Sequence, residues 1–113
     1  MEKHGFKMFG ELAIITGRGN RALARDIADA LHVRLLETQI IDFDNENIFV
    51  QLKESVRAQD VFIIQPTCSP VNRNLMELLI LLDTVRRASA GRITAVMPFY
   101  AYARSDKKDM PRV

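Results

Sequence analysis

The chain has 113 residues, of which 48% are hydrophobic and 27% are charged, and its formal net charge is +2. This composition is typical of one globular domain and excludes intrinsic disorder, while a single cysteine, Cys68, excludes a disulfide scaffold. The longest purely aliphatic run, residues 78–82, is far shorter than the roughly 20 residues of a membrane span, so no membrane partner is expected.

The N-terminal part of the chain predicts a strand followed by a helix. The apolar run at residues 12–16 indicates a buried strand, and Asn20 stands where it can cap a helix that continues to about His32. Gly17 and Gly19 lie between the two, where glycines can let backbone N–H groups approach a phosphate. The segment lacks the third glycine of a dinucleotide motif and the lysine of a P-loop, so a tight turn that needs small residues is the favoured interpretation.

The next segment predicts a hairpin. Apolar residues alternate with polar ones over residues 36–40 and again over residues 48–52, which is typical of two half-exposed strands. The turn between them carries Asp42, Asp44 and Glu46, a grouping that could suggest a cation site. Because the turn lacks the glycine and the spacing of a calcium loop, a solvated acidic turn is the favoured interpretation.

The second half of the chain predicts two more buried strands and one apolar helix. The strands are expected over residues 60–65 and 92–97, because each is a continuous apolar run of the kind found in a covered parallel sheet. The helix lies between them, with Pro70 at its first position, and it runs to about Ala88.

This helix and the turn before it carry three further signals. Asn74 and Glu77 stand three residues apart, which suggests a variant of the capping box. Leucine and isoleucine occur on most sides of the helix, so we expect it to be buried or at an interface, and the isolated domain to associate. Cys68 is interpreted as structural, because neither His4 nor His32 is near it in the sequence.

Strands that alternate with helices predict an α/β fold, with a mainly parallel sheet flanked by helices and a protruding β-hairpin. Ligands of such sheets bind beyond the carboxyl ends of the strands. These ends lead into residues 17–20, 65–69 and 98–104, so a polar site is expected on the edge where they meet.

The C-terminal quarter carries an excess of positive charge. Residues 86–113 contain seven basic and two acidic side chains, and the densest cluster is residues 104–109. Phe99, Tyr100 and Tyr102 precede this cluster and could stack on a base, so contact with a nucleotide or polyphosphate is one interpretation. The alternative is a solvated helix end followed by a basic exit from the domain.

Three segments resemble ribose-phosphate pyrophosphokinase, also called phosphoribosyl pyrophosphate synthetase: NLMELL at residues 74–79, RASAGRITAV at 87–96 and YARSDKKD at 102–109. The resemblance implies a type I phosphoribosyltransferase-like fold, in which residues 1–113 form the N-terminal, ATP-binding domain of a two-domain synthetase. It implies transfer of the β,γ-diphosphoryl group of ATP to ribose 5-phosphate, with Mg²⁺, for nucleotide biosynthesis. The family's catalytic residues and metal ligands lie beyond this chain, so the 113 residues alone are expected to be inactive.

The resemblance also assigns site residues by matching positions. The family's adenine-binding turn, which a neighbouring subunit contributes, corresponds to Phe43, Asn45 and Asn47. The other implied ATP-binding residues are Arg104, Ser105, Lys107, Lys108 and Asp109. The implied regulatory phosphate site consists of Ser55, Arg57 and Arg112. Three positions depart from the family, because Asn47 replaces a glutamate, Ser105 replaces a glutamine, and Glu46 stands where a glycine is common.

Alternatives to an active synthetase stay open. The departures at Asn47 and Ser105 favour a catalytically inactive, regulatory homologue associated with the synthetase. A generic nucleotide- or nucleic-acid-binding module would explain the basic C-terminal quarter but not the long matches, and the small net charge argues against nucleic acid as a partner. The partners implied by the resemblance are ATP, ribose 5-phosphate and identical subunits, assembled as a hexamer in the family. The single cysteine and the lack of an export signal predict a cytoplasmic protein.

Overall fold

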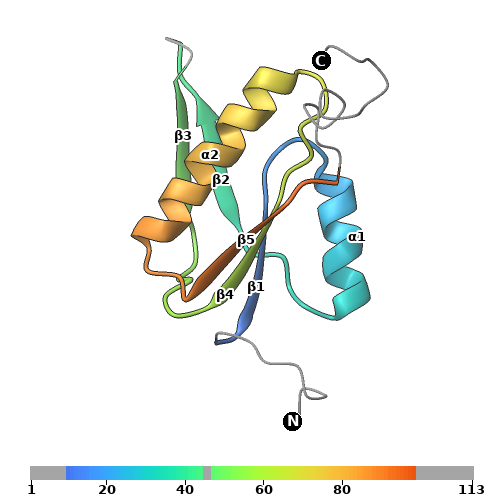
Figure 1. Ribbon diagram of the computed structural model, residues 1–113, viewed down its shortest axis with the longest axis vertical. Coiled ribbons are helices and arrows are strands. Elements are labelled where there is room, and N and C mark those ends of the chain that lie inside the picture. Colours follow the sequence, from blue (N-terminus) through green and yellow to red (C-terminus); the bar gives the residue numbers. More distant parts are fainter. Residues whose placement is uncertain (1–9, 45–46, 99–113) are drawn as a thin grey trace, which may run out of the picture.

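Three parallel strands form the central sheet, and a computed structural model describes residues 10–44 and 47–98 around it (Figure 1). In the order in which they pair, the strands are β1 (Leu12–Thr16), β4 (Asp60–Ile64) and β5 (Arg92–Val96). Their register is level, since Thr16 pairs with Ile64 and Ile64 pairs with Val96. All three strands therefore end at one edge, which confirms the predicted parallel sheet, with strand ends within one residue of those expected.

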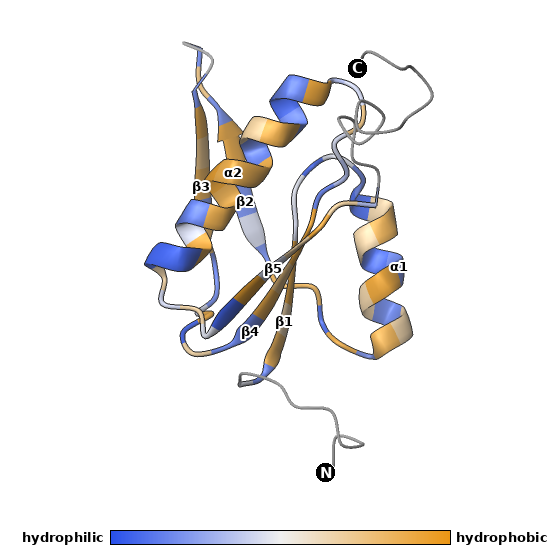
Figure 2. Cartoon of the chain, viewed as in Figure 1, coloured by the Kyte–Doolittle hydropathy of each residue, from blue (hydrophilic) through white to orange (hydrophobic). Residues whose placement is uncertain are grey.

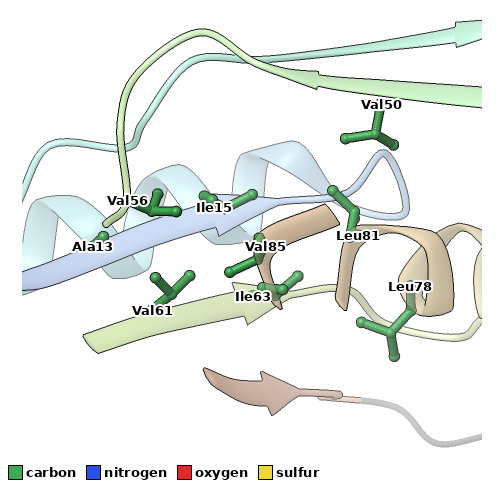
Figure 3. Close-up of a cluster of buried hydrophobic side chains, with 9 residues drawn as sticks. All are labelled: Ala13, Ile15, Val50, Val56, Val61, Ile63, Leu78, Leu81 and Val85. Atoms are coloured by element: carbon green, nitrogen blue, oxygen red, sulfur yellow. The ribbon is translucent and has the colours of Figure 1, made fainter. Parts of the chain in front are cut away.

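Two helices cover opposite faces of this sheet, α1 (Arg21–Leu31) on one side and α2 (Val71–Arg87) on the other (Figure 1). Successive strand residues point to opposite faces, so the strands supply both cores. The smaller core, under α1, consists of Ile14, Ala24, Ala28 and Ile64. The larger core, under α2, is drawn in Figure 3 and consists of Ala13, Ile15, Val50, Val56, Val61, Ile63, Leu78, Leu81 and Val85. Polar and apolar residues alternate along both helices (Figure 2), and α2 buries two polar residues, Asn74 and Glu77, together with its apolar ones.

The predicted hairpin forms a separate antiparallel sheet of two strands, β2 (Thr38–Asp42) and β3 (Ile48–Leu52). It runs beside α2 (Figure 1), and Asp42, at the end of β2, accepts a hydrogen bond from Arg73 in the first turn of that helix. We call this end of the hairpin, with Asp42, Phe43 and Asn47, its tip. Val50 is 8% exposed and joins the core under α2, while the residues on either side of it in β3 are more exposed. The hairpin is thus attached to the body through one apolar side, as its alternating pattern predicts.

A clamp of charged groups closes the base of the hairpin. The Glu54 carboxylate accepts two hydrogen bonds from the Arg34 guanidinium, one of them at 2.7 Å, and a third from the Glu37 backbone N–H at 3.0 Å. Because Arg34 precedes β2 and Glu54 follows β3, the clamp ties the two ends of the hairpin together.

The two helices begin in different ways. Asn20 caps α1 as predicted, because its Oδ1 accepts a hydrogen bond of 3.0 Å from the Leu23 N–H. Helix α2 begins at Val71, one residue later than expected, and Pro70 is its N-cap residue. Within the described part of the chain, neither helix has the length and apolar content that crossing a membrane requires.

The predicted capping box at the start of α2 is wrong. Asn74 lies inside the helix, where its Nδ2 donates to the Cys68 carbonyl oxygen at 2.9 Å. Glu77 is 1% exposed and points into the interior, where an arginine from another element pairs with it. A long-range ion pair stabilises Glu77 in this buried position. The spacing of Asn74 and Glu77 along the helix gives no sign of that pair.

Candidate functional site

The carboxyl ends of the strands form a polar edge, as the sequence predicts. The Gly17 N–H donates to the Ile64 carbonyl at 3.0 Å, and the Gln65 N–H donates to the Val96 carbonyl at 3.0 Å, so the segments that leave the three strands lie side by side. The third of these segments is described only at its start, up to Pro98. A pocket of about 250 Å³ opens at this edge and is lined by Arg18, Gly19, Ser69, Pro70, Arg73, Asn74 and Glu77.

The glycine turn after β1 is packed tightly against Gln65. A Cβ atom on Gly17 would lie 2.4 Å from the Gln65 carboxamide, and one on Gly19 would lie 2.9 Å from its Oε1. The N–H groups of the turn also have protein partners, since Arg18 donates to Glu77 Oε2 at 2.6 Å and Gly19 donates to Gln65 Oε1 at 2.8 Å. These contacts support a tight turn that needs small residues and leave these N–H groups engaged rather than free to hold a phosphate.

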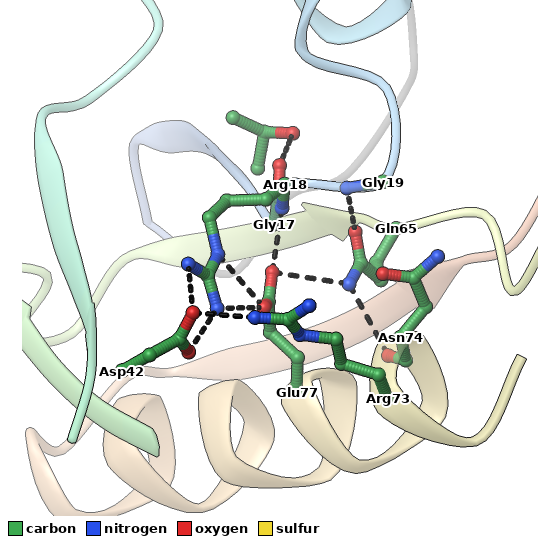
Figure 4. A network of polar contacts seen from close by, with 9 residues as sticks. Gly17, Arg18, Gly19, Asp42, Gln65, Arg73, Asn74 and Glu77 are labelled. Carbon is green, nitrogen blue, oxygen red and sulfur yellow. Dashed lines mark hydrogen bonds and ion pairs between the residues drawn. The ribbon is translucent and has the colours of Figure 1, made fainter. Parts of the chain in front are cut away.

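Glu77 is the buried centre of the polar network at this edge (Figure 4). Its carboxylate accepts from the Arg18 backbone N–H, from Arg18 Nε at 3.0 Å and Nη2 at 2.8 Å, and from Gln65 Nε2 at 3.2 Å. A carboxylate this deeply buried is stable only when it is both paired and hydrogen-bonded. Arg18 meets that need and thereby fixes the turn after β1 to α2.

Asp42, at the end of β2, extends the network to the hairpin. It accepts from Arg18 Nη1 at 3.1 Å and Nη2 at 2.8 Å, and from Arg73 of α2 (Figure 4). The hydrogen bonds from Arg18, and then the one from Arg73, hold the pKa of the Asp42 carboxyl below its usual range. Asp42 is exposed, as the predicted solvated acidic turn requires, and two guanidinium groups also bind it. Asp44 is exposed in the turn, and Glu46 lies outside the described residues.

Two of the residues assigned to adenine, Phe43 and Asn47, meet at the hairpin tip. The Phe43 N–H donates to the Asn47 carbonyl at 2.8 Å. Both residues line a cavity of about 480 Å³, together with Ile48, Phe49, Met76 and Ile80. The Phe43 ring is tilted against Phe49, with 6.1 Å between ring centroids, and Phe43 is 50% exposed. An exposed ring beside a carboxamide can stack on a planar base and hydrogen-bond to its edge.

The structure separates this tip from the two described residues of the implied regulatory site. Ser55 and Arg57 follow β3, at the base of the hairpin, and Ser55 Oγ accepts from the Arg57 backbone N–H at 3.2 Å. The other assigned positions lie outside the described residues and stay predictions: Asn45, Arg104, Ser105, Lys107, Lys108, Asp109 and Arg112.

Sequence reasoning missed the residues that build this edge, above all Arg18 and Glu77. One signal for Glu77 is present, because it is the only charged residue in the apolar run of residues 75–82. A carboxylate in such a run needs a partner, and an arginine in a turn at the carboxyl edge of the sheet is a candidate. Nothing in the sequence indicates that Asp42 joins the same arginine.

Comparison with known proteins identifies relatives along nearly the whole chain. Residues 12–113 match the N-terminal domain of ribose phosphate pyrophosphokinase. The chain is 51% identical over 112 residues to the ribose-phosphate pyrophosphokinase of Clostridium perfringens, which covers 99% of this chain and 34% of that protein. It is 54% identical over 101 residues to the ribose-phosphate pyrophosphokinase 2, chloroplastic, of Oryza sativa, which covers 89% of this chain and 25% of that protein.

The fold is similar to that of a solved structure with a related sequence. The crystal structure of phosphoribosylpyrophosphate synthetase from Mycobacterium smegmatis superposes with a TM-score of 0.83 at 45% sequence identity, over 91% of this chain and 35% of that one. The chain therefore spans about a third or less of the length of these relatives.

Proposed function

The chain belongs to the family of the N-terminal domain of ribose phosphate pyrophosphokinase, and from that membership we propose that it is the ATP-binding part of an enzyme that makes phosphoribosyl pyrophosphate. The enzyme transfers the β,γ-diphosphoryl group of ATP to O1 of ribose 5-phosphate and releases AMP. Because the chain spans about a third or less of its relatives, a C-terminal domain of the longer protein completes the site and supplies the catalytic residues.

The observation that carries the proposal is the hairpin tip. Phe43 and Asn47, which the resemblance assigns to adenine, line one cavity although they lie on opposite sides of the turn. The half-exposed phenyl ring of Phe43 stacks on the base, and the Asn47 carboxamide can both donate to and accept from its edge. Arg104, Lys107 and Lys108 then neutralise the phosphates. The arginine can donate two parallel hydrogen bonds to a phosphate, and each lysine supplies a compact positive charge.

The described residues build no magnesium site of their own. No group of three or more His, Cys, Asp or Glu side chains converges among residues 10–44 and 47–98. Asp42 and Glu77 are occupied by arginines, so neither presents a free carboxylate to a cation. Magnesium enters the reaction with ligands from the rest of the protein, and no step here is assigned to it.

Exposed apolar side chains support association with identical subunits. Met76 and Leu79 of α2 are 52% and 49% exposed, and Phe49 of β3, which lines the same cavity as Met76, is 44% exposed. A second copy that covers this surface would remove apolar area from water, as the hexamer of the family requires. We place the protein in the cytoplasm, where Cys68, which is free in the structure, would stay reduced.

The test of the function is an assay of the full reading frame. We expect the full-length protein to release AMP from ATP only when ribose 5-phosphate and Mg²⁺ are both present, and the 113-residue chain to release none. Reactions that lack ribose 5-phosphate control for simple hydrolysis of ATP. AMP that forms at the same rate without the sugar, or not at all, would favour the alternative, an inactive regulatory homologue.

A further inference from the structure

We propose that Asp42 is a positioning residue for the nucleotide: its ion pairs with Arg18 and Arg73 fix the hairpin tip that carries Phe43 and Asn47. The inference rests on the proposed function, because that function assigns the tip to the base of ATP. Asp42 itself need not touch the nucleotide. It is the last residue of β2 and the direct neighbour of Phe43. Because one peptide bond joins the two residues, ion pairs that fix the position of Asp42 also restrict the position of Phe43.

The tip needs such a tether, because the hairpin is a two-stranded sheet with no strand pairing to the central sheet. An isolated hairpin of two strands is marginal in water. Its apolar side packs on the body, where Val50 joins the core and Ile40 and Ile48 pack against it, and its charged clamp at Glu54 lies at the base. Apolar packing is non-directional, so it does not by itself fix the orientation of the tip. Asp42 is the described residue that ties the tip end to the body by ion pairs.

The anchor to which Asp42 is tied is rigid. The Arg18 guanidinium is already oriented by the buried Glu77 carboxylate, and its backbone N–H donates to the same carboxylate. Arg18 Nη1 and Nη2 then reach the two oxygens of Asp42 in a bidentate arrangement, which fixes direction as well as distance. Arg73 adds a contact from the first turns of α2.

The positive and negative charges of the network balance. Two guanidinium groups face two carboxylates, and each carboxylate is bound by Arg18. Removing the charge of Asp42 leaves the Arg18–Glu77 pair intact, so the body of the domain keeps its structure while the tip loses its tether. Substitution of Arg18 or Glu77 would not give an equally clean test, because Glu77 is buried and breaking its ion pair would destabilise the whole domain.

The test compares Asp42→Asn with Asp83→Asn in the full-length protein. Asp83 is the matched control, because it also accepts from two arginines, Arg86 and Arg87, but lies far along α2 from the tip. If the tip of Asp42→Asn is correctly placed only about a tenth to a fifth of the time, the KM and the dissociation constant for ATP rise about five- to tenfold. We expect kcat and the KM for ribose 5-phosphate to change less than about twofold, since neither depends on the tip in this account.

Hydrogen exchange supplies a readout that does not depend on turnover. In Asp42→Asn we expect faster amide exchange at Phe43, whose N–H is bound at the tip, and unchanged exchange in the central strands β1 and β4. Asp83→Asn is expected to match the wild type in both measurements, and Asp42→Glu, which keeps the carboxylate, to recover most of the ATP affinity.

Three results would overturn the role of Asp42. They are an unchanged affinity for ATP in Asp42→Asn, an equal rise in the KM of both substrates, and a tip whose exchange stays as slow as in the wild type. A wild-type protein that makes no phosphoribosyl pyrophosphate would refute the proposed function separately, because the ATP dissociation constant and the exchange rates still decide the role of Asp42.

Discussion

At the scale of single residues, the least replaceable contact is the one between Arg18 and Glu77. Glu77 is 1% exposed and Arg18 is 27% exposed at its side chain, so one charge is buried and the other reaches solvent. Removing the arginine leaves an uncompensated carboxylate in the core, whereas removing both partners leaves no buried charge at all. The loss of stability in the double variant should therefore be smaller than the sum of the losses in the two single variants.

This difference gives the first prediction. Arg18→Ala should lower the free energy of unfolding of the 113-residue chain by about 3 kcal/mol, in the range for breaking a buried pair. Arg18→Ala combined with Glu77→Leu should be more stable than Arg18→Ala alone. Urea denaturation monitored by circular dichroism measures both. Costs that simply add in the double variant would show that the two side chains are not coupled.

At the scale of elements, the hairpin is held at its base by Glu54 and at its tip end by Asp42, with Val50 packed between them. The hydrogen bonds from Arg34, then that from the Glu37 N–H, lower the pKa of Glu54 from an ordinary value near 4.5 to about 2. A lowered pKa stabilises the folded state fully above the ordinary pKa, and this stabilisation is lost as the pH falls through the folded value.

The second prediction follows from that sign. The difference in free energy of unfolding between the wild type and Glu54→Gln should be constant at pH 5 and above. It should shrink steadily as the pH falls from about 4.5 towards 2. Urea titrations at a series of pH values between 7 and 3 measure the difference. A gap that stays the same at pH 3 would mean that the Glu54 charge does not hold the hairpin base.

The elements themselves were largely predictable, because their causes are local. Buried strands appear as short apolar runs, the hairpin appears as alternation, and Asn20 precedes a helix in the way that N-cap residues do. The network was not predictable, since Arg18 is 24 residues from Asp42 and 59 from Glu77. Local spacing cannot show pairs of residues so far apart in the sequence. For the same reason, the spacing of Asn74 and Glu77 suggested a capping box that the structure does not contain. Phe43 and Asn47 came from the family resemblance rather than from any periodicity.

At the scale of the whole molecule, two regions of apolar surface stand out among residues 10–44 and 47–98. One is the surface of α2 and β3 with Met76, Leu79 and Phe49. The other is a cavity of about 230 Å³ with no polar lining, formed beside α1 by Leu12, Ile14, Ile27, Leu31, Phe62, Ile64 and Val96. Exposed apolar surfaces of this kind are typically covered by another segment of the protein or by another subunit.

The third prediction concerns the first of these surfaces. The chain should associate in sedimentation velocity, and Leu79→Lys should shift it towards the monomer, because a charge would have to be buried in the contact. Ala30→Lys is the control, since Ala30 is also exposed on a helix but lies on α1 and lines neither of the two apolar regions. A wild-type chain that sediments as a monomer at all concentrations, or a Leu79→Lys variant that associates as strongly, would contradict the account.

The central claim is that the hairpin tip holds the base of ATP, and the dissociation constant of ATP measured by calorimetry on the full-length protein tests it most directly. Stacking on an aromatic ring is worth about 1–3 kcal/mol per base, so Phe43→Ala should weaken ATP roughly 5- to 150-fold. Leu31→Ala, a variant of comparable exposure on α1, should bind ATP as the wild type does. Equal dissociation constants for Phe43→Ala and the wild type would contradict the assignment of the tip to the nucleotide.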